Sequence, residues 1–284
     1  MELEKRFGSF RNHPAVTEYP KLFELDFYGE GLIETVFYLD NDFKLSEDAF
    51  NDTELKSMYE SSLPEIIAYL EHVKDLFVKT EFEKFIREQE VVHQDLINAI
   101  IKTMTDKPLN SILEDYLGVK QPKQRFVLSL LLRPFLGFPH CENGERESIL
   151  IISRMLLERA IQYNYFERNV IACFWHEFSH PVINPLTDVL FDNSHDMSDE
   201  QRAWYCTVNE SIIEGINLRL KLREKVINQD FIEQSITNSI RNGALKIREC
   251  ADLLEKYEKN RDKYPDIGAF YPEFLPIFGE KPNK

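Results

Sequence analysis

The chain has 284 residues, of which 43% are hydrophobic and 12% aromatic, a composition typical of a folded globular protein and not of a disordered or fibrous one. Its formal net charge is −15, from 34 basic and 49 acidic side chains, so phosphate backbones and anionic lipid surfaces would repel it. We therefore expect neither nucleic acid nor a membrane as a partner.

The amino-terminal sequence Met1–Arg6 is charged and lacks the apolar segment of a signal peptide. No stretch approaches the roughly 18 apolar residues that a membrane helix needs. As written, the sequence predicts a cytoplasmic protein. A chain whose export signal had been removed would look the same and would belong to an exported protein.

The first 120 residues predict a mostly helical segment. Leu63–Lys79 carries apolar residues at helical spacing, and Pro64 suits the first turn of that helix. A second helix is expected over Glu81–Met104. A short third helix is expected over Asn110–Leu117, ending at Gly118.

Two apolar runs follow, and both are typical of β-strands. Arg125–Phe135 is unbroken, and Ser148–Ile152 is rich in β-branched residues. Between them, Asn143-Gly144 is a strong hairpin signal. We expect an antiparallel pair of strands, with Pro134 placing the first strand at a sheet edge.

Helices return in the last part of the chain. One is expected over Leu156–His180. Another is expected over Ser198–Arg223, beginning with a capping box between its first residue and Gln201. Two more are expected over residues 230–242 and 244–264.

The stretch Trp175–His180 reads Trp-His-Glu-Phe-Ser-His. Positions i and i+4 of an α-helix share a face, so His176 and His180 can direct their imidazoles at one zinc ion. Glu177, offset by about 100° on that face, can act as the general base toward a water molecule at the metal. A chance pair of histidines on a polar face is the alternative. Pro181 disfavours helical geometry at His180, so the helix is expected to end or bend there.

A later helix offers the third ligand that an open zinc site needs. Glu210 and Glu214 lie four residues apart in Asn209–Glu214, within an otherwise apolar helix where unpaired carboxylates would be costly. We expect Glu210 to bind zinc and Glu214 to accept the N–H of a ligand imidazole. The alternative is a solvated acidic face, balanced by Arg219 and Lys221.

Together the two motifs resemble those of the thermolysin-like gluzincin metallopeptidases, with a longer spacer and a glutamate as the final acid. The resemblance implies that His176, His180 and Glu210 hold Zn²⁺. It also implies that Glu177 is the general base and that Glu214 hydrogen-bonds a zinc histidine. The expected function is hydrolysis of peptide bonds with a metal-activated water, on a peptide or protein substrate. The oligomeric state is left open.

More of the chain is similar to a little-characterised bacterial family, a domain of unknown function that carries a His-Glu-Phe-Ser-His motif. The similar stretches are Asn12–Val16, Asp75–Phe82, Leu131–Pro134 and His176–Leu186. The resemblance covers most of the chain and implies a metallopeptidase of unknown substrate in a family whose members are usually exported.

These observations predict an α+β fold that is predominantly α-helical. A small antiparallel sheet, formed by an edge-strand hairpin, would pack on a zincin-like active-site helix and the following glutamate helix. We expect one domain over residues 1–284, with a mostly helical part over 1–120 and a zincin-like catalytic part over 121–284. Residues 126–135 would be the edge along which an extended peptide adds.

When water attacks a peptide carbonyl, negative charge develops on the carbonyl oxygen, and stabilising this oxyanion needs a hydrogen-bond donor besides the metal. The candidates for it are His195, Tyr205, His140 and Tyr271. Two other functions compete with the peptidase. One is a non-peptidase hydrolase or an inactive zinc-binding protein of the same fold, and the other is a metal-free helical interaction module.

Overall fold

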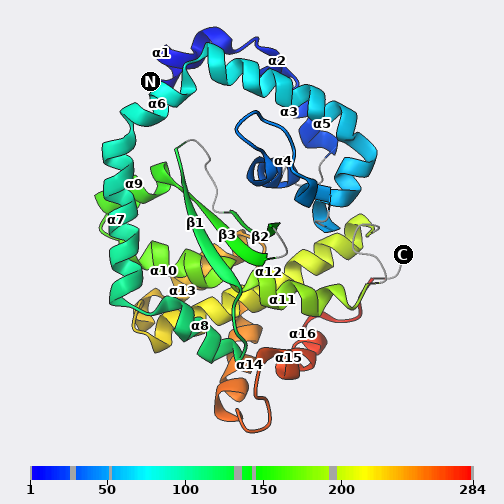
Figure 1. The fold of residues 1–284 in the computed structure, drawn as a ribbon. Helices are drawn as coiled ribbons and strands as arrows, with labels where there is room; N and C mark the ends of the chain where they lie inside the picture. The colour runs from blue at the N-terminus through cyan, green and yellow to red at the C-terminus, as the bar shows by residue number, and fades with distance from the viewer. Residues whose placement is uncertain are drawn as a thin grey trace. The chain divides into compact units, whose positions relative to one another are not determined.

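The computed structural model describes residues 2–25, 30–50, 53–130, 136–142, 145–191 and 197–282. It is a predominantly α-helical α+β structure, as the sequence predicts, and it contains a small three-stranded sheet (Figure 1). The chain divides into two compact units, one of residues 1–94 with 140–147 and the other of residues 95–139 with 148–284. The single domain expected over the whole chain stays a prediction.

The first unit consists of short helices and one long helix. Its elements are α1 (Glu2–Phe7), the 3-10 helix η1 (Gly8–Phe10), α2 (Pro14–Thr17), α3 (Tyr19–Leu25), α4 (Glu30–Thr35), η2 (Val36–Tyr38), η3 (Glu47–Phe50), α5 (Thr53–Lys79) and α6 (Phe82–Glu88). Its core contains Leu22, Tyr38, Ala49, Ile66 and Leu70.

Two helix boundaries in this region differ from the prediction. The long helix α5 begins at Thr53, so Pro64 lies inside it and not in its first turn. The single helix expected over residues 81–104 is two helices, because α6 ends at Glu88 and α7 (Glu90–Asp106) follows it.

The remainder of the chain continues from α7. Its elements are α8 (Leu109–Leu117), β1 (Lys123–Ser129), β2 (Leu136–Glu142), β3 (Glu145–Ser153), α9 (Arg154–Gln162), α10 (Phe166–Glu177), α11 (His180–Asp188), α12 (Asp199–Arg223), η5 (Gln229–Phe231), α13 (Ile232–Arg241), α14 (Ile247–Lys259), α15 (Ile267–Phe270), η6 (Tyr271–Glu273) and α16 (Leu275–Phe278). Two predicted helix ends are confirmed: α8 stops at Gly118, which has a φ of 74°, and α12 starts with the Ser198–Gln201 capping box.

The sheet has three strands, in the order β1-β3-β2, and is mixed, whereas the sequence predicts an antiparallel pair. The run expected as one strand over residues 125–135 is interrupted, because β1 ends at Ser129 and β2 begins at Leu136. Pro134 and the predicted turn at residues 143–144 lie outside the described residues. β1 is at an edge, as predicted. β3 is central, and its residues Ile149–Ile152 are at most 2% exposed, which explains their unbroken apolar run.

Helix α12 is central in the second unit and contacts α10, α11, α13 and α14 (Figure 1). On α10 an apolar stripe is buried, with Val170, Ile171, Phe174, Trp175 and Phe178 (which follows the helix) at most 1% exposed. Burial of each such side chain stabilises the fold by about 1.5–3 kcal/mol. The helix is therefore held firmly by one face while its histidines lie on another.

Strand β1 packs on the same helix. The ring of Phe126 lies 5.7 Å from the rings of both Phe174 and Phe178, measured between centroids. The sheet thus covers α10 near its carboxyl end. Across the described residues, every helix is too short or too polar to span a bilayer.

Candidate metal centre

The His-Glu-Phe-Ser-His motif is divided between two helices. The predicted helix over residues 156–180 is three helices: α9, α10 and the start of α11. α10 ends at Glu177, and Pro181 lies in the first turn of α11, where a missing backbone N–H is tolerated. The expected interruption at the second histidine is therefore confirmed. A second proline, Pro185, lies inside α11.

The junction keeps the two histidines on one side despite this interruption. Phe178 donates its N–H to the carbonyl of Phe174 at 3.0 Å, and Ile183 donates to the carbonyl of Ser179 at 3.0 Å. The hydroxyl of Ser179 donates to the carbonyl of Trp175. The backbone therefore turns between α10 and α11 without losing the helical spacing of His176 and His180.

Three potential metal ligands meet from three helices. One donor atom each of His176, His180 and Glu210 lies within 4.8 Å of the other two. The Nε2 atoms of the two histidines are 3.3 Å apart. The Glu210 carboxylate oxygens lie 3.6 Å from Nε2 of His176 and 3.7 Å from Nε2 of His180. In the described part of the chain, no other set of His, Cys, Asp and Glu side chains converges in this way.

The spacing of the two imidazoles fits tetrahedral coordination. Two nitrogens bound at about 2.05 Å and separated by the tetrahedral angle lie about 3.3 Å apart. The observed separation is 3.3 Å. The Glu210 carboxylate is a few tenths of an ångström farther from each ring, with a different oxygen facing each histidine. The donor set of two imidazoles and one carboxylate therefore fits a divalent metal ion.

The second nitrogen of each ring lies beside a side-chain oxygen atom. Nδ1 of His176 lies 3.0 Å from the Glu214 carboxylate, and Nδ1 of His180 lies 3.2 Å from the side-chain oxygen of Asn184. A proton at Nδ1 suits both contacts, and with a metal ion in place of the Nε2 proton each ring would present its Nε2 lone pair to the metal. The contact of Glu214 is the one that the sequence predicts. Asn184 was missed, although its i+4 spacing from His180 on one helix was available as a signal.

Buried charges make this cluster favourable for a cation. Burial opposes protonation of His176, but the hydrogen bond and charge of Glu214 outweigh it and raise the pKa of His176 above its usual range. Burial also opposes ionisation of Glu214, yet His176 holds its pKa low. Burial and the nearby charge of His176 lower the pKa of His180 to about 3. Burial raises the pKa of Glu210 and of Glu177. A divalent cation would neutralise the negative charge of these carboxylates, which is costly to bury.

Glu177 lines a cavity of about 780 Å³ together with His176, Glu210 and Glu214. The backbone of Gly137, on strand β2, hydrogen-bonds to the Glu177 carboxylate. A Cβ atom at Gly137 would lie 2.6 Å from Oε2 and 2.8 Å from Cβ of Glu177. Only glycine, which has no side chain, lets β2 approach Glu177 this closely. The strand therefore holds the Glu177 carboxylate in place.

Replacing Gly137 by alanine is therefore expected to lower the free energy of unfolding by about 1–3 kcal/mol, because the new methyl group overlaps Glu177. Urea denaturation measures this change. Gly268→Ala is the matched control: its Cβ would meet Asp266 Oδ1 at 3.2 Å and Leu186 Cδ2 at 3.6 Å, and we expect a loss below about 1 kcal/mol. Equal losses in the two variants would contradict the close approach of β2.

A buried hydrogen-bond network fixes the helix that carries Glu210. The hydroxyl of Thr187, on α11, donates to the side-chain oxygen of Asn209, next to Glu210 on α12. The hydroxyl of Tyr271 lies 2.6 Å from the Thr187 hydroxyl. This network ties α11, α12 and the carboxyl-terminal segment together directly beside the cluster.

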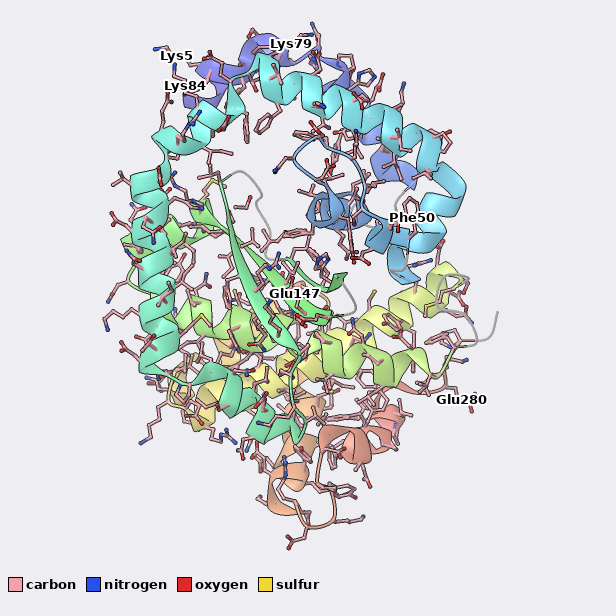
Figure 2. All side chains as sticks on the ribbon, viewed as in Figure 1. Lys5, Phe50, Lys79, Lys84, Glu147 and Glu280 are labelled. Carbon is pink, nitrogen blue, oxygen red and sulfur yellow. The ribbon has the colours of Figure 1, made fainter. Side chains whose placement is uncertain are left out.

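The four residues predicted as possible oxyanion donors are not among the converging metal ligands. Tyr205 donates its hydroxyl to Asp188 at 2.8 Å, and Tyr271 is part of the network with Thr187. His140 belongs to the first unit, where its ring lies 4.5 Å from that of Tyr38 and its Nε2 lies 4.0 Å from Glu147, which is labelled in Figure 2. His195 lies outside the described residues. The oxyanion donor stays a prediction.

The structure thus defines a predominantly helical α+β protein in which two histidines and one glutamate could hold a metal ion. The family model described as a domain of unknown function, DUF4932, matches residues 42–277, and the chain belongs to that family. Comparison with curated proteins and with solved structures finds no match.

Proposed function

We propose that this protein is a zinc-dependent hydrolase that cleaves peptide bonds. The observation that carries the proposal is the pair of Nε2 atoms 3.3 Å apart, both facing Glu210, with a side-chain oxygen beside Nδ1 of each ring. In the metal-free protein a proton on His176 can bridge the two nitrogens, because its pKa is raised, and a divalent cation would take the place of that proton. The oxygen atoms beside the two Nδ1 atoms orient the rings so that the Nε2 atoms face the position that a metal ion would take.

The donor set supports zinc as that cation. Two imidazoles and one carboxylate form a common set in catalytic zinc sites, and they leave a position for substrate or water. Calcium and magnesium prefer oxygen ligands only. The order of the residues in the chain, with Glu210 four residues before Glu214, supports the gluzincin-like assignment that the motifs suggest.

The chain's own residues supply the remaining chemistry. A bound zinc ion would act as a Lewis acid and lower the pKa of a water molecule. Glu177 would take the proton of the attacking water and pass it to the leaving amine. Burial raises its pKa, which makes the carboxylate a stronger base toward the water proton, and the Gly137 backbone keeps the carboxylate pointed at the cavity. Glu214 would hold His176 in the tautomer that presents Nε2.

Elemental analysis combined with a peptidase assay tests the proposal. The full chain, purified with added zinc, is expected to hold about one zinc per molecule and to hydrolyse a mixture of fluorescence-quenched peptides. A chelator should abolish hydrolysis, and zinc should restore it. Stoichiometric zinc without hydrolysis would contradict the peptidase. Absence of bound metal, with no melting shift on chelation, would contradict the metal site itself and favour a helical interaction module.

A further inference from the structure

The cavity beside the metal centre is lined by residues of α10 and α12. These two helices lie side by side (Figure 1). On α12 its lining residues include Glu214, Asn217 and Lys221, at the spacing that places side chains on one face. On α10 the lining runs back from His176 to Arg168. The cavity is therefore a trough with the metal cluster near one end and two basic residues toward the other.

This far end is positively charged in an acidic protein. The cavity residues away from the cluster include Lys221 and Arg168 but no aspartate or glutamate, although the chain carries a net charge of −15. The adjoining cavity of about 570 Å³ also contains Arg168, together with Lys225, and has no acidic residue in its lining.

The two basic side chains have no carboxylate at ion-pair distance among the described residues. Lys221 is 7% exposed, and its Nζ contacts the hydroxyl of Ser235 at 3.3 Å. The guanidinium of Arg168 lies over the rings of Tyr165 and Phe231, at 5.9 Å and 5.5 Å from their centroids. A buried ammonium group without a close counter-ion is costly, and burial lowers the pKa of Lys221 although Glu214 opposes that change. An anion in the trough would offset this cost.

Helix α13 gives the trough a polar wall. Its amides and hydroxyls there are those of Gln234, Ser235, Asn238 and Ser239. Such groups donate hydrogen bonds to carbonyl and carboxylate oxygens and accept them from amide N–H groups. The wall therefore suits an extended peptide that lies in the trough.

We infer that the trough is a substrate subsite that binds a carboxylate, held by Lys221 and Arg168. The inference rests on the hydrolase proposed above and names its substrates: peptides with a carboxylate a few residues from the scissile bond. Glu210 and Lys221 lie about 16 Å apart along α12, so the carboxylate is expected within about five extended residues of the bond. The carboxylate is either an acidic side chain or the free carboxyl terminus.

Three versions of an alanine-rich, fluorescence-quenched peptide separate these sources. The first carries glutamate, placed at each position in turn, and an amidated carboxyl terminus. The second carries glutamine and a free carboxyl terminus, and the third carries glutamine and an amide. We expect the zinc-loaded wild type to prefer one carboxylate peptide over the neutral peptide by about tenfold or more in kcat/KM, mainly through KM. The version that is preferred identifies the source.

Lys221→Met and Arg168→Met are each expected to reduce that preference to within about threefold. The preference is a ratio measured within one variant, so a general loss of folded protein does not change it. Arg223→Met is the matched control, because it removes the same charge from α12 at an exposed position beside Glu224 and is expected to keep the wild-type preference. If Lys221→Met does not fold, Arg168→Met alone decides the outcome.

The outcomes distinguish this inference from the proposed function. Hydrolysis of all three peptides with equal kcat/KM would overturn the carboxylate subsite and leave the hydrolase intact. If no peptide is cleaved, the hydrolase fails, and titration calorimetry of the same peptides tests the subsite by itself. Tighter binding of a carboxylate peptide, lost in Lys221→Met, supports the subsite. Equal binding of the three peptides overturns it.

Discussion

Replacing Glu177 by glutamine is expected to lower kcat/KM for a peptide substrate by about 10²- to 10⁴-fold, with wild-type zinc content. The amide keeps the size of the side chain but cannot accept the proton of the attacking water. Glu177 is not among the three converging ligands, so the metal should stay bound. Steady-state kinetics and elemental analysis on the same sample measure both quantities.

Glu167→Gln is the control for this substitution. Glu167 lies in the first turn of α10 and is exposed, so the same change of charge on the same helix should leave the kinetics unchanged. Turnover that persists in Glu177→Gln would show that Glu177 is not the base. Loss of zinc together with turnover would show that its role is in metal binding.

Replacing Glu210 by glutamine is expected to change stability in opposite directions with and without zinc. Without metal, Glu210 is a largely buried carboxylate whose pKa is raised, chiefly by burial. A raised pKa means that the folded state binds the proton more tightly than the unfolded state, so the ionised group destabilises the fold at neutral pH. The neutral amide removes this cost, and we expect the metal-free variant to be at least as stable as the wild type.

The stabilising effect of glutamine in the metal-free protein depends on pH. The pKa of a glutamate in the unfolded chain is 4.5. Below that pH, Glu210 is protonated in both the folded and the unfolded state, and glutamine should no longer be more stable than glutamate. With zinc at neutral pH, the wild type is expected to be the more stable of the two proteins. At a free zinc concentration of 100 times Kd, zinc binding raises the free energy of unfolding of the wild type by about 2.7 kcal/mol, whereas the variant has lost a ligand and is stabilised far less. Urea denaturation with and without zinc measures these differences.

Glu200→Gln provides the comparison on the same helix. Glu200 is exposed in the first turn of α12 and far along the helix from Glu210, so its zinc response should match that of the wild type. A Glu210→Gln protein that is stabilised by zinc as strongly as the wild type would exclude Glu210 as a ligand. A large loss of stability without metal would indicate a structural role in place of a metal site.

The sequence predicted the features that depend on residues within about one helical turn of each other. The capping box of Ser198 and Gln201 starts α12, and the glycine at 118 ends α8, as expected. The apolar stripe of α10 is buried as its period indicates. The i, i+4 spacing of His176 and His180 likewise indicated two imidazoles on one side. These patterns are local, because the backbone geometry of a helix fixes which neighbouring side chains share a face.

Only the tertiary structure decided the features that depend on contacts between elements. The apolar run over residues 125–135 predicts one strand, whereas β1 ends within it and β2 begins after it. The period of the apolar residues carries no information on which strands pair. The approach of Gly137 to Glu177 joins residues from a strand and a helix far apart in the chain. Arg168 and Lys221 line one trough because α10 packs on α12. Packing of separate helices sets these distances, and no spacing within the sequence encodes them.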